Sequence, residues 1–241
     1  MAKIRIKKMQ PADVLIGLIL GIILTVVTIK FIVPHIGSST NDNNADSTAQ
    51  GLATTISDSP YLGNKDEAQV AIVEFSDFEC PYCQQFFENT FDQIIKNYVD
   101  KGKVIFVYRN LPLAFHEPAA TKEANAALCV KNLKDNSAYF EMARLIYNNS
   151  GLNGKGISSD DLIKFAKQAG ADQSKFEECL NSNQYNGTVQ KDADAAGQVG
   201  ISGTPSFVVG KLTSDGTVKG ETLIGAQPFS AFEEAINKYL K

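Results

Sequence analysis

The chain has 241 residues and a formal net charge of -4 at pH 7, with 21% charged residues. The first thirty residues carry five Lys or Arg against Asp13, which leaves -8 for everything after Lys30. A protein that binds nucleic acid needs a basic surface for the phosphates, so this acidic remainder excludes nucleic acid as a partner.

The N-terminus predicts a membrane anchor. Residues 1–13 are basic, and residues 14–36 are apolar apart from Lys30 and His35, a length that crosses a bilayer core of about 30 Å. Basic residues before the span predict a cytoplasmic N-terminus and a single-pass protein of the cell membrane whose remainder is extracytoplasmic. A cleaved signal peptide, with residues 37–39 as the cleavage site, remains the alternative.

A polar segment separates this anchor from the rest of the chain. Residues 37–57 are rich in Ser, Thr, Asn, Asp, Ala and Gly and contain little that can build a core, which predicts a flexible linker. The remaining residues, 58–241, suit one globular domain or one domain that carries an insertion.

Hydrophobic periodicity predicts the elements of that domain. A strand at 70–75, a helix at 80–99 and a strand at 103–108 form a β-α-β unit, which implies a parallel strand pair. A helical region follows, and two strands and a helix close the chain. The helices of this region are predicted at 118–133, 137–148, 159–169, 173–182 and 185–198, the strands at 206–210 and 217–224, and the last helix at 228–240.

The first strand runs into a Cys-Pro-Tyr-Cys motif that opens the helix. Helix N-terminal amides favour a thiolate at Cys80, and Pro81 fits the first turn, where no amide is needed. Cys83 lies on the same helix face, within reach of a disulfide with Cys80. The motif therefore indicates a redox-active dithiol, with half of a zinc site or an inert disulfide as alternatives. Zinc needs further ligands, and no second Cys pair is present.

Three linked motifs resemble a known family. They are Tyr-Leu-Gly-Asn at 61–64, the strand and cysteine motif at 73–83, and the segment at 200–207 that contains Thr204-Pro205. Together they resemble DsbA-type thiol-disulfide oxidoreductases of the thioredoxin superfamily. The resemblance implies an α/β thioredoxin fold, β-α-β then β-β-α, with a helical insertion at about 113–199. It also implies that Thr204-Pro205 is a cis bond, that Pro205 faces Cys80, and that Thr204 pairs with substrate.

The resemblance assigns roles to other residues as well. Glu74 interrupts an apolar strand, where burial would raise its pKa and suit proton transfer with Cys83, and the family has an acid there. A solvent-facing side chain is the alternative. Cys129 and Cys179 are a candidate structural disulfide, because some relatives have such a pair, with two buried thiols as the alternative. Tyr82 stands where the strongest oxidases of the family carry histidine, which predicts a moderate oxidant.

Three further side chains complete the sequence-based interpretation of the site. Asp77 and Glu79 are expected to shape and solvate the turn before Cys80, and His116 is expected to cap or pack. The predicted function is a membrane-tethered dithiol oxidase that needs no cofactor or metal. Its substrates would be exported proteins with cysteines, and the resemblance suggests a quinone-linked membrane partner. A reductase or isomerase, and a metal or protein chaperone, are the alternatives.

Overall fold

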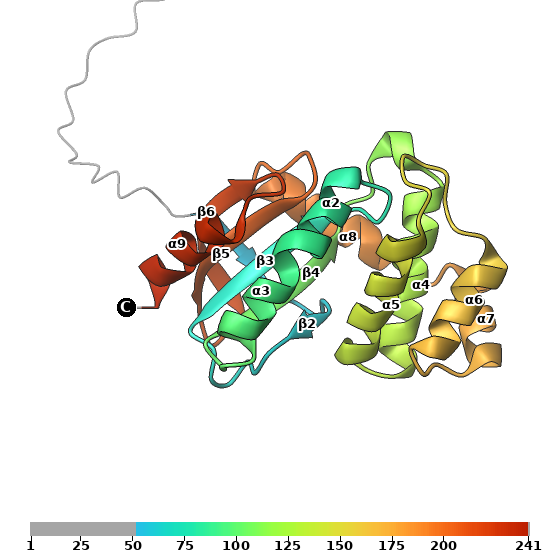
Figure 1. Ribbon diagram of the computed structural model, residues 1–241, viewed down its shortest axis with the longest axis horizontal. Coiled ribbons are helices and arrows are strands. Elements are labelled where there is room, and N and C mark those ends of the chain that lie inside the picture. The colour runs from blue at the N-terminus through green and yellow to red at the C-terminus, as the bar shows by residue number, and fades with distance from the viewer. Residues whose placement is uncertain (1–51, 241) are drawn as a thin grey trace, which may run out of the picture. The chain divides into compact units, whose positions relative to one another are not determined.

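The computed structural model describes residues 52–240, which form a β-sheet covered by helices with a helical bundle beside it (Figure 1). Within that range no helix is both long enough and apolar enough to cross a membrane. The predicted anchor, residues 14–36, lies outside the described residues.

Six strands form one sheet whose centre is β3. The spatial order is β1 (Leu52–Thr55), β6 (Thr217–Ile224), β5 (Ser206–Leu212), β3 (Val70–Ser76), β4 (Val104–Asn110) and β2 (Tyr61–Leu62). The β3–β4 pair is parallel and every other pair is antiparallel. The predicted β-α-β then β-β-α order is therefore confirmed.

Two strands, β1 and β2, were not predicted. β1 lies inside the predicted linker, residues 37–57, so that prediction is wrong from Leu52 onwards. β1 joins the sheet edge through its pairing with β6, from Leu52 opposite Gly220 to Thr55 opposite Thr217. A short edge strand of this kind is held by main-chain pairing, so its side chains show no alternation by which to recognise it.

The helices fall into three groups. The chain turns from β3 into a continuous helical segment made of α2 (Pro81–Phe86), η1 (Phe87–Phe91), α3 (Asp92–Ile94) and η2 (Ile95–Val99), where η1 and η2 have the wider turns of a π-helix. After the short 3-10 turn η3 (Ala114–His116) come α4 (Ala119–Leu133), α5 (Asn136–Asn149), α6 (Ser159–Gln168), α7 (Gln173–Ser182) and α8 (Asn186–Gln198). The chain closes with α9 (Phe229–Tyr239).

The alternation of β3 side chains separates two cores. Ile72 and its same-face neighbours pack with Phe86 of α2 and Phe232 of α9, in a cluster that continues into the α4–α7 bundle. Val73 and its neighbours face the other way and pack with Ala196 of α8. The sheet is thus covered on both faces, which explains why β3 is buried along its whole length.

Most of the predicted insertion, residues 113–199, forms the bundle of α4–α7 beside the sheet (Figure 1). α8 differs, because it lies against β3 and β4 as well as against α4. A disulfide between Cys129 of α4 and Cys179 of α7 crosses the bundle, with the two cysteines 50 residues apart in sequence.

Candidate active site

Cys80 lies where β3 ends and α2 begins. It is the N-cap residue of α2, with Pro81 in the first turn, and its amide donates to the Asp77 carbonyl at 3.1 Å. Its thiol lies 3.5 Å from the carbonyl oxygen of Thr204. The pKa of Cys80 falls to about 6, mainly because of a hydrogen bond from Cys83, with further help from Thr204 and helix amides against the opposing effect of burial. A thiolate is therefore favoured at this position.

Cys83 lies one turn deeper and is fully buried. Burial is the main reason why its pKa is raised well above the usual value, and the neighbouring Cys80 and Glu74 raise it further. The two thiols thus differ sharply: Cys80 is the nucleophile and leaving group, and Cys83 keeps its proton. Such a difference suits a pair in which one sulfur exchanges with outside thiols and the other closes the internal disulfide.

The loop before β5 faces the cysteines, as the resemblance implies. The Thr204-Pro205 bond is cis. The Pro205 carbonyl accepts a hydrogen bond from Gly225 at 2.8 Å, which fixes the loop to the end of β6. Thr204, half-buried, contacts Cys80, so the loop forms one wall of the site.

Glu74 is buried and does not turn to solvent. Its Oε1 accepts a hydrogen bond from Ser76 Oγ at 2.8 Å, while Oε2 has no partner among the described residues. The pKa of Glu74 rises to about 8, chiefly through burial, although the Ser76 hydrogen bond lowers it and Cys80 raises it. The strand explains the burial: Glu74 pairs with Tyr108 of β4 on one side and Phe207 of β5 on the other.

The turn between β3 and α2 is held by a buried aspartate. Asp77 accepts hydrogen bonds from the amides of Glu79 and Leu113, both at 2.8 Å, and lies 2.7 Å from His116 Nδ1. His116 packs as expected, but Asp77 and Glu79 do not solvate the turn as predicted, because both are buried. The bonds to Leu113 and His116 join the turn to the start of the insertion. Asp77 therefore makes its hydrogen bonds with protein groups and not with solvent.

Another buried carboxyl, Glu123 of α4, lies against Glu79. Ser150 donates to Glu79 from the end of α5, and both glutamates are fully buried. The pKa of Glu123 rises to about 9, first because of burial and then because of the charge and hydrogen bond of Glu79. Sequence reasoning missed Glu123, since one acid in an otherwise ordinary helix gives no sign that it is buried.

Three large apolar side chains on segments that belong to the site or adjoin it are exposed at the surface. Among residues 52–240, the large apolar side chains that are mainly exposed are Tyr82 at 64%, Phe115 at 75% and Ile224 at 59%. Tyr82 lies inside the cysteine motif, and the Phe115 ring packs on His116. Ile224 pairs with Ser206, next to Pro205. This exposed apolar rim suits contact with an unfolded or extended polypeptide.

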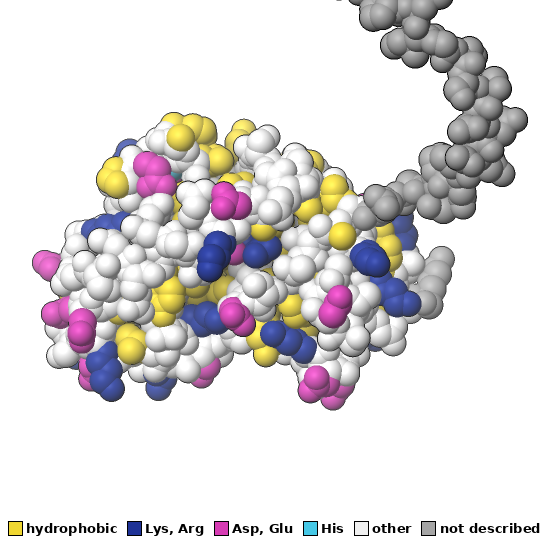
Figure 2. Space-filling view, turned by 180° about the vertical axis from the view of Figure 1, so that it is seen from behind, with side chains coloured by type: hydrophobic (Ala, Val, Ile, Leu, Met, Phe, Trp, Pro, Cys, Tyr) yellow, Lys and Arg dark blue, Asp and Glu magenta, His cyan; other side chains and the backbone are white. Residues whose placement is uncertain are grey.

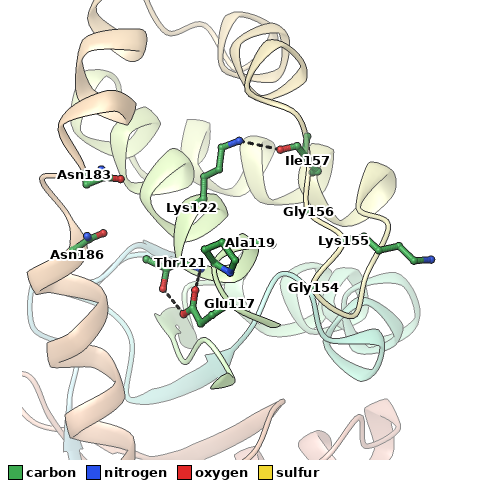
Figure 3. A pocket seen from close by; sticks show the side chains of 11 residues that line it. Glu117, Ala119, Thr121, Lys122, Gly154, Lys155, Gly156, Ile157, Asn183 and Asn186 are labelled. Carbon is green, nitrogen blue, oxygen red and sulfur yellow. Dashed lines mark hydrogen bonds between the residues drawn. The ribbon is translucent and has the colours of Figure 1, made fainter. Parts of the chain in front are cut away.

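A cavity of about 610 Å³ lies apart from the cysteines, between α4, the corner from α7 to α8 and the loop 154–157 (Figure 3). Lys122 donates to the Ile157 carbonyl at 3.2 Å, and Lys155 points away from the cavity. Neither reactive sulfur lines it, so it is not the reaction site. On the face in Figure 2, basic and acidic side chains are interspersed and form no single-sign stripe. Within the described range no group of three or more His, Cys, Asp or Glu is arranged to hold a metal ion.

Comparison with known proteins agrees with this geometry. A family model described as Thioredoxin matches residues 55–237. The probable disulfide bond formation protein D of Bacillus cereus is 28% identical over 181 residues, which cover 73% of this chain and 77% of that protein. The crystal structure of oxidised BdbD from Bacillus subtilis superposes with a TM-score of 0.67 at 24% identity, covering 79% of this chain and 98% of that one.

Another relative is much longer than the matched region. The Na(+)/H(+) antiporter NhaA 3 of Salinispora tropica is 33% identical over 178 residues, which cover 74% of this chain but 26% of the antiporter. The chain thus spans about a quarter of that relative. The family match, which the order of the strands in the sheet supports, establishes that this chain belongs to the thioredoxin family.

Proposed function

We propose that the protein is an extracytoplasmic dithiol oxidase that introduces disulfides into exported proteins. The observation that carries the proposal is the contrast between the two buried sulfurs: a thiolate is stabilised at Cys80, while Cys83 keeps its proton. An active-site disulfide whose reduced form is stabilised in this way gives up its bond readily to a substrate thiol. The names of the Bacillus relatives, disulfide bond formation protein D, support the same direction of electron flow.

The reaction follows from the position of each group. A substrate thiolate attacks Cys80 in the oxidised protein, the Cys80–Cys83 bond breaks, and a mixed disulfide forms. The second substrate thiol then attacks the substrate sulfur of that mixed disulfide, and Cys80 leaves as a thiolate. The Cys83 thiol and the backbone amides of Tyr82 and Cys83 stabilise this leaving group, and Glu74 exchanges a proton with Cys83.

The substrate is an extended segment with apolar residues near its cysteine. The backbone of Thr204 and the ring of Pro205 form the wall on which the segment lies, and Tyr82 and Phe115 contact its side chains. Such contacts demand little sequence specificity, which suits an enzyme that acts on many exported proteins.

We infer from the N-terminal sequence that this domain is held at the outer surface of the membrane. Residues 14–36 are the single anchor and residues 37–51 the linker, with Cys80 on the extracytoplasmic side. Reoxidation of the dithiol then falls to a quinone-linked protein of the same membrane. A reductase on the same fold is the competing function, and it is favoured by one observation: Tyr82 adds no positive charge beside the Cys80 thiolate.

Two single substitutions test the proposal. Cys80→Ser is expected to abolish oxidation of a reduced dithiol peptide. With substrates that carry a single cysteine, Cys83→Ser is expected to accumulate mixed disulfides through Cys80 that survive non-reducing electrophoresis, because Cys83 is no longer present to attack Cys80 and release them. The Cys129→Ala/Cys179→Ala double variant is the control and should behave like the wild type in both assays. A Cys83→Ser protein that stays active and traps nothing contradicts the two-cysteine mechanism.

A further inference from the structure

The cavity between α4, the α7–α8 corner and the loop 154–157, here called the insertion cavity, is joined to the reactive turn by that loop. The amide of Asn153 donates to the carbonyl of Glu79 at 2.8 Å, and Ser150 donates to the Glu79 carboxyl. Glu79 is the residue directly before Cys80. The segment that forms one wall of the insertion cavity therefore also holds the residue that precedes the nucleophile.

The same loop packs closely on the segment that carries Phe115. Gly154 has a φ of +80°, and a Cβ at this position would lie 3.3 Å from the Phe115 carbonyl oxygen and 3.4 Å from His116 Cα. Residues 117–119, which follow directly, line the cavity. The start of α2 and the start of α4 lie at the same end of the domain (Figure 1). The exposed apolar rim at Phe115 and the insertion cavity are thus neighbouring parts of one surface.

The charges that face the insertion cavity are already met by neighbouring groups. Lys122 donates to the Ile157 carbonyl at 3.2 Å, and the Glu117 carboxylate accepts from the hydroxyl and the amide of Thr121. The side chain of Lys155 points away (Figure 3). This lining favours an uncharged ligand, because no ammonium or carboxylate is left for a ligand charge of opposite sign.

Two asparagines supply polar groups of the kind that bind a polypeptide. Asn183 and Asn186 are exposed and extend from the α7–α8 corner towards the cavity (Figure 3). A side-chain amide offers the same donor and acceptor as a peptide bond. Asn125 occupies the Asn186 oxygen at 2.7 Å, which leaves the Asn186 amino group for a ligand. Pro118 and Ala119 add apolar surface, and the volume of about 610 Å³ falls in the range of ligand sites.

We propose that the insertion cavity binds a second stretch of the exported substrate polypeptide, an uncharged extended segment on one side of the cysteine that reacts with Cys80. This inference rests on the proposed function and specifies its substrates as unfolded chains, which the enzyme favours over small thiols. The covalent path through Glu79 and its bond to Asn153 puts the α-carbons of Cys80 and Gly154 at most about 14 Å apart. An extended chain covers that distance in about four to six residues.

The test measures the oxidation of reduced peptides by the full chain. Each peptide carries the same two-cysteine core and an uncharged extension of about three, six or nine residues, or none, on its N-terminal or its C-terminal side. For the wild type we expect KM to fall about fivefold once the extension on one of the two sides reaches about six residues. The value of kcat should not depend on the extension, because the cavity contacts the chain away from the reacting sulfurs.

Two variants change the cavity without touching the cysteines. Asn186→Trp places an indole at the α7–α8 corner, where it occupies the space of the ligand. Asn183→Gly/Asn186→Ala removes both amides, and glycine keeps the left-handed backbone of Asn183, whose φ is 52°. In both variants KM should become independent of the extension.

Glu141→Trp is the matched control, because it places the same indole at an exposed position of α5 that does not line the cavity. It should keep the fall in KM with extension. A wild-type KM that does not fall on either side, or a fall that persists in Asn186→Trp, overturns the proposal. If Asn186→Trp does not fold, a fall that persists in Asn183→Gly/Asn186→Ala overturns it.

Two other results have different meanings. If extension has no effect and the wild type instead forms a dimer in sedimentation that Asn186→Trp disrupts, the cavity binds a second copy of the chain and the proposal is wrong. If the wild type oxidises none of the peptides, including the one without an extension, the proposed function itself is contradicted.

Discussion

Removal of the bundle disulfide should destabilise the domain, and the number of residues between its two cysteines determines by how much. Cys129 and Cys179 close a loop 50 residues apart in sequence and hold α4 against α7. Cross-linking a loop of this length removes chain entropy from the unfolded state worth about 4 kcal/mol at 25 °C. For a domain of this size each kcal/mol shifts the melting temperature by about 2–4 °C. Cys129→Ala/Cys179→Ala is therefore expected to melt about 8–16 °C lower than the wild type.

The assay is thermal unfolding of the oxidised protein followed by far-ultraviolet circular dichroism. Alanine is the chosen replacement because serine would bury an extra hydroxyl at two buried positions. The Cys80→Ala/Cys83→Ala variant is the matched control: it leaves the bundle disulfide intact and should show no free thiol when unfolded without reductant. Two titrating thiols in that control, or an unchanged melting temperature in Cys129→Ala/Cys179→Ala, would refute the reasoning.

Three further substitutions probe the turn around Cys80. Folded Glu123 keeps a proton that the unfolded chain has released, so this one group should lower the stability by about 1.4 kcal/mol per pH unit as pH rises from about 4.3 towards 9; Glu123→Gln should make the slope in urea denaturation shallower by that amount, with the contribution of Glu74 remaining, and parallel curves for the two proteins would contradict it. Asp77→Asn breaks the buried pair with His116 and should cost about 3 kcal/mol in the same assay, whereas a cost below about 1 kcal/mol would show that the pair does not hold the turn. Tyr82→His places an imidazolium beside Cys80 and should bring the pKa of Cys80 below about 6, measured from the pH dependence of its alkylation; an unchanged pKa would contradict the electrostatic argument.

The central part of the site could be predicted because its signals are local. An apolar run, a Cys-Pro-Tyr-Cys motif and Thr204-Pro205 each stand in a few consecutive residues, and the thiolate of Cys80 is favoured by neighbours within the same motif, first Cys83 and then the amides of the helix start. The order of the central strands and helices follows from periodicity for the same reason.

The buried polar groups behind the cysteines could not be predicted in this way. Ser76 and Tyr147 are 71 residues apart and meet through the packing of α5 on the sheet, which no pattern in the sequence encodes. In the sequence Glu123 and Asp77 look like ordinary surface acids, and only the packing of the helical insertion against the rest of the domain buries them. β1 could not be predicted for the same reason: it forms a strand because it pairs with β6, which is distant in the sequence.

The measurement that tests the oxidase assignment most directly is the reduction potential of the Cys80/Cys83 couple. The lowered pKa of Cys80 stabilises the reduced form, and Tyr82 adds no charge, so we predict a moderately oxidising value between about -200 and -100 mV. Equilibration with glutathione and separation of the two forms by mobility gives the value. A potential at or below that of thioredoxin, about -270 mV, would contradict the account and identify a reductase.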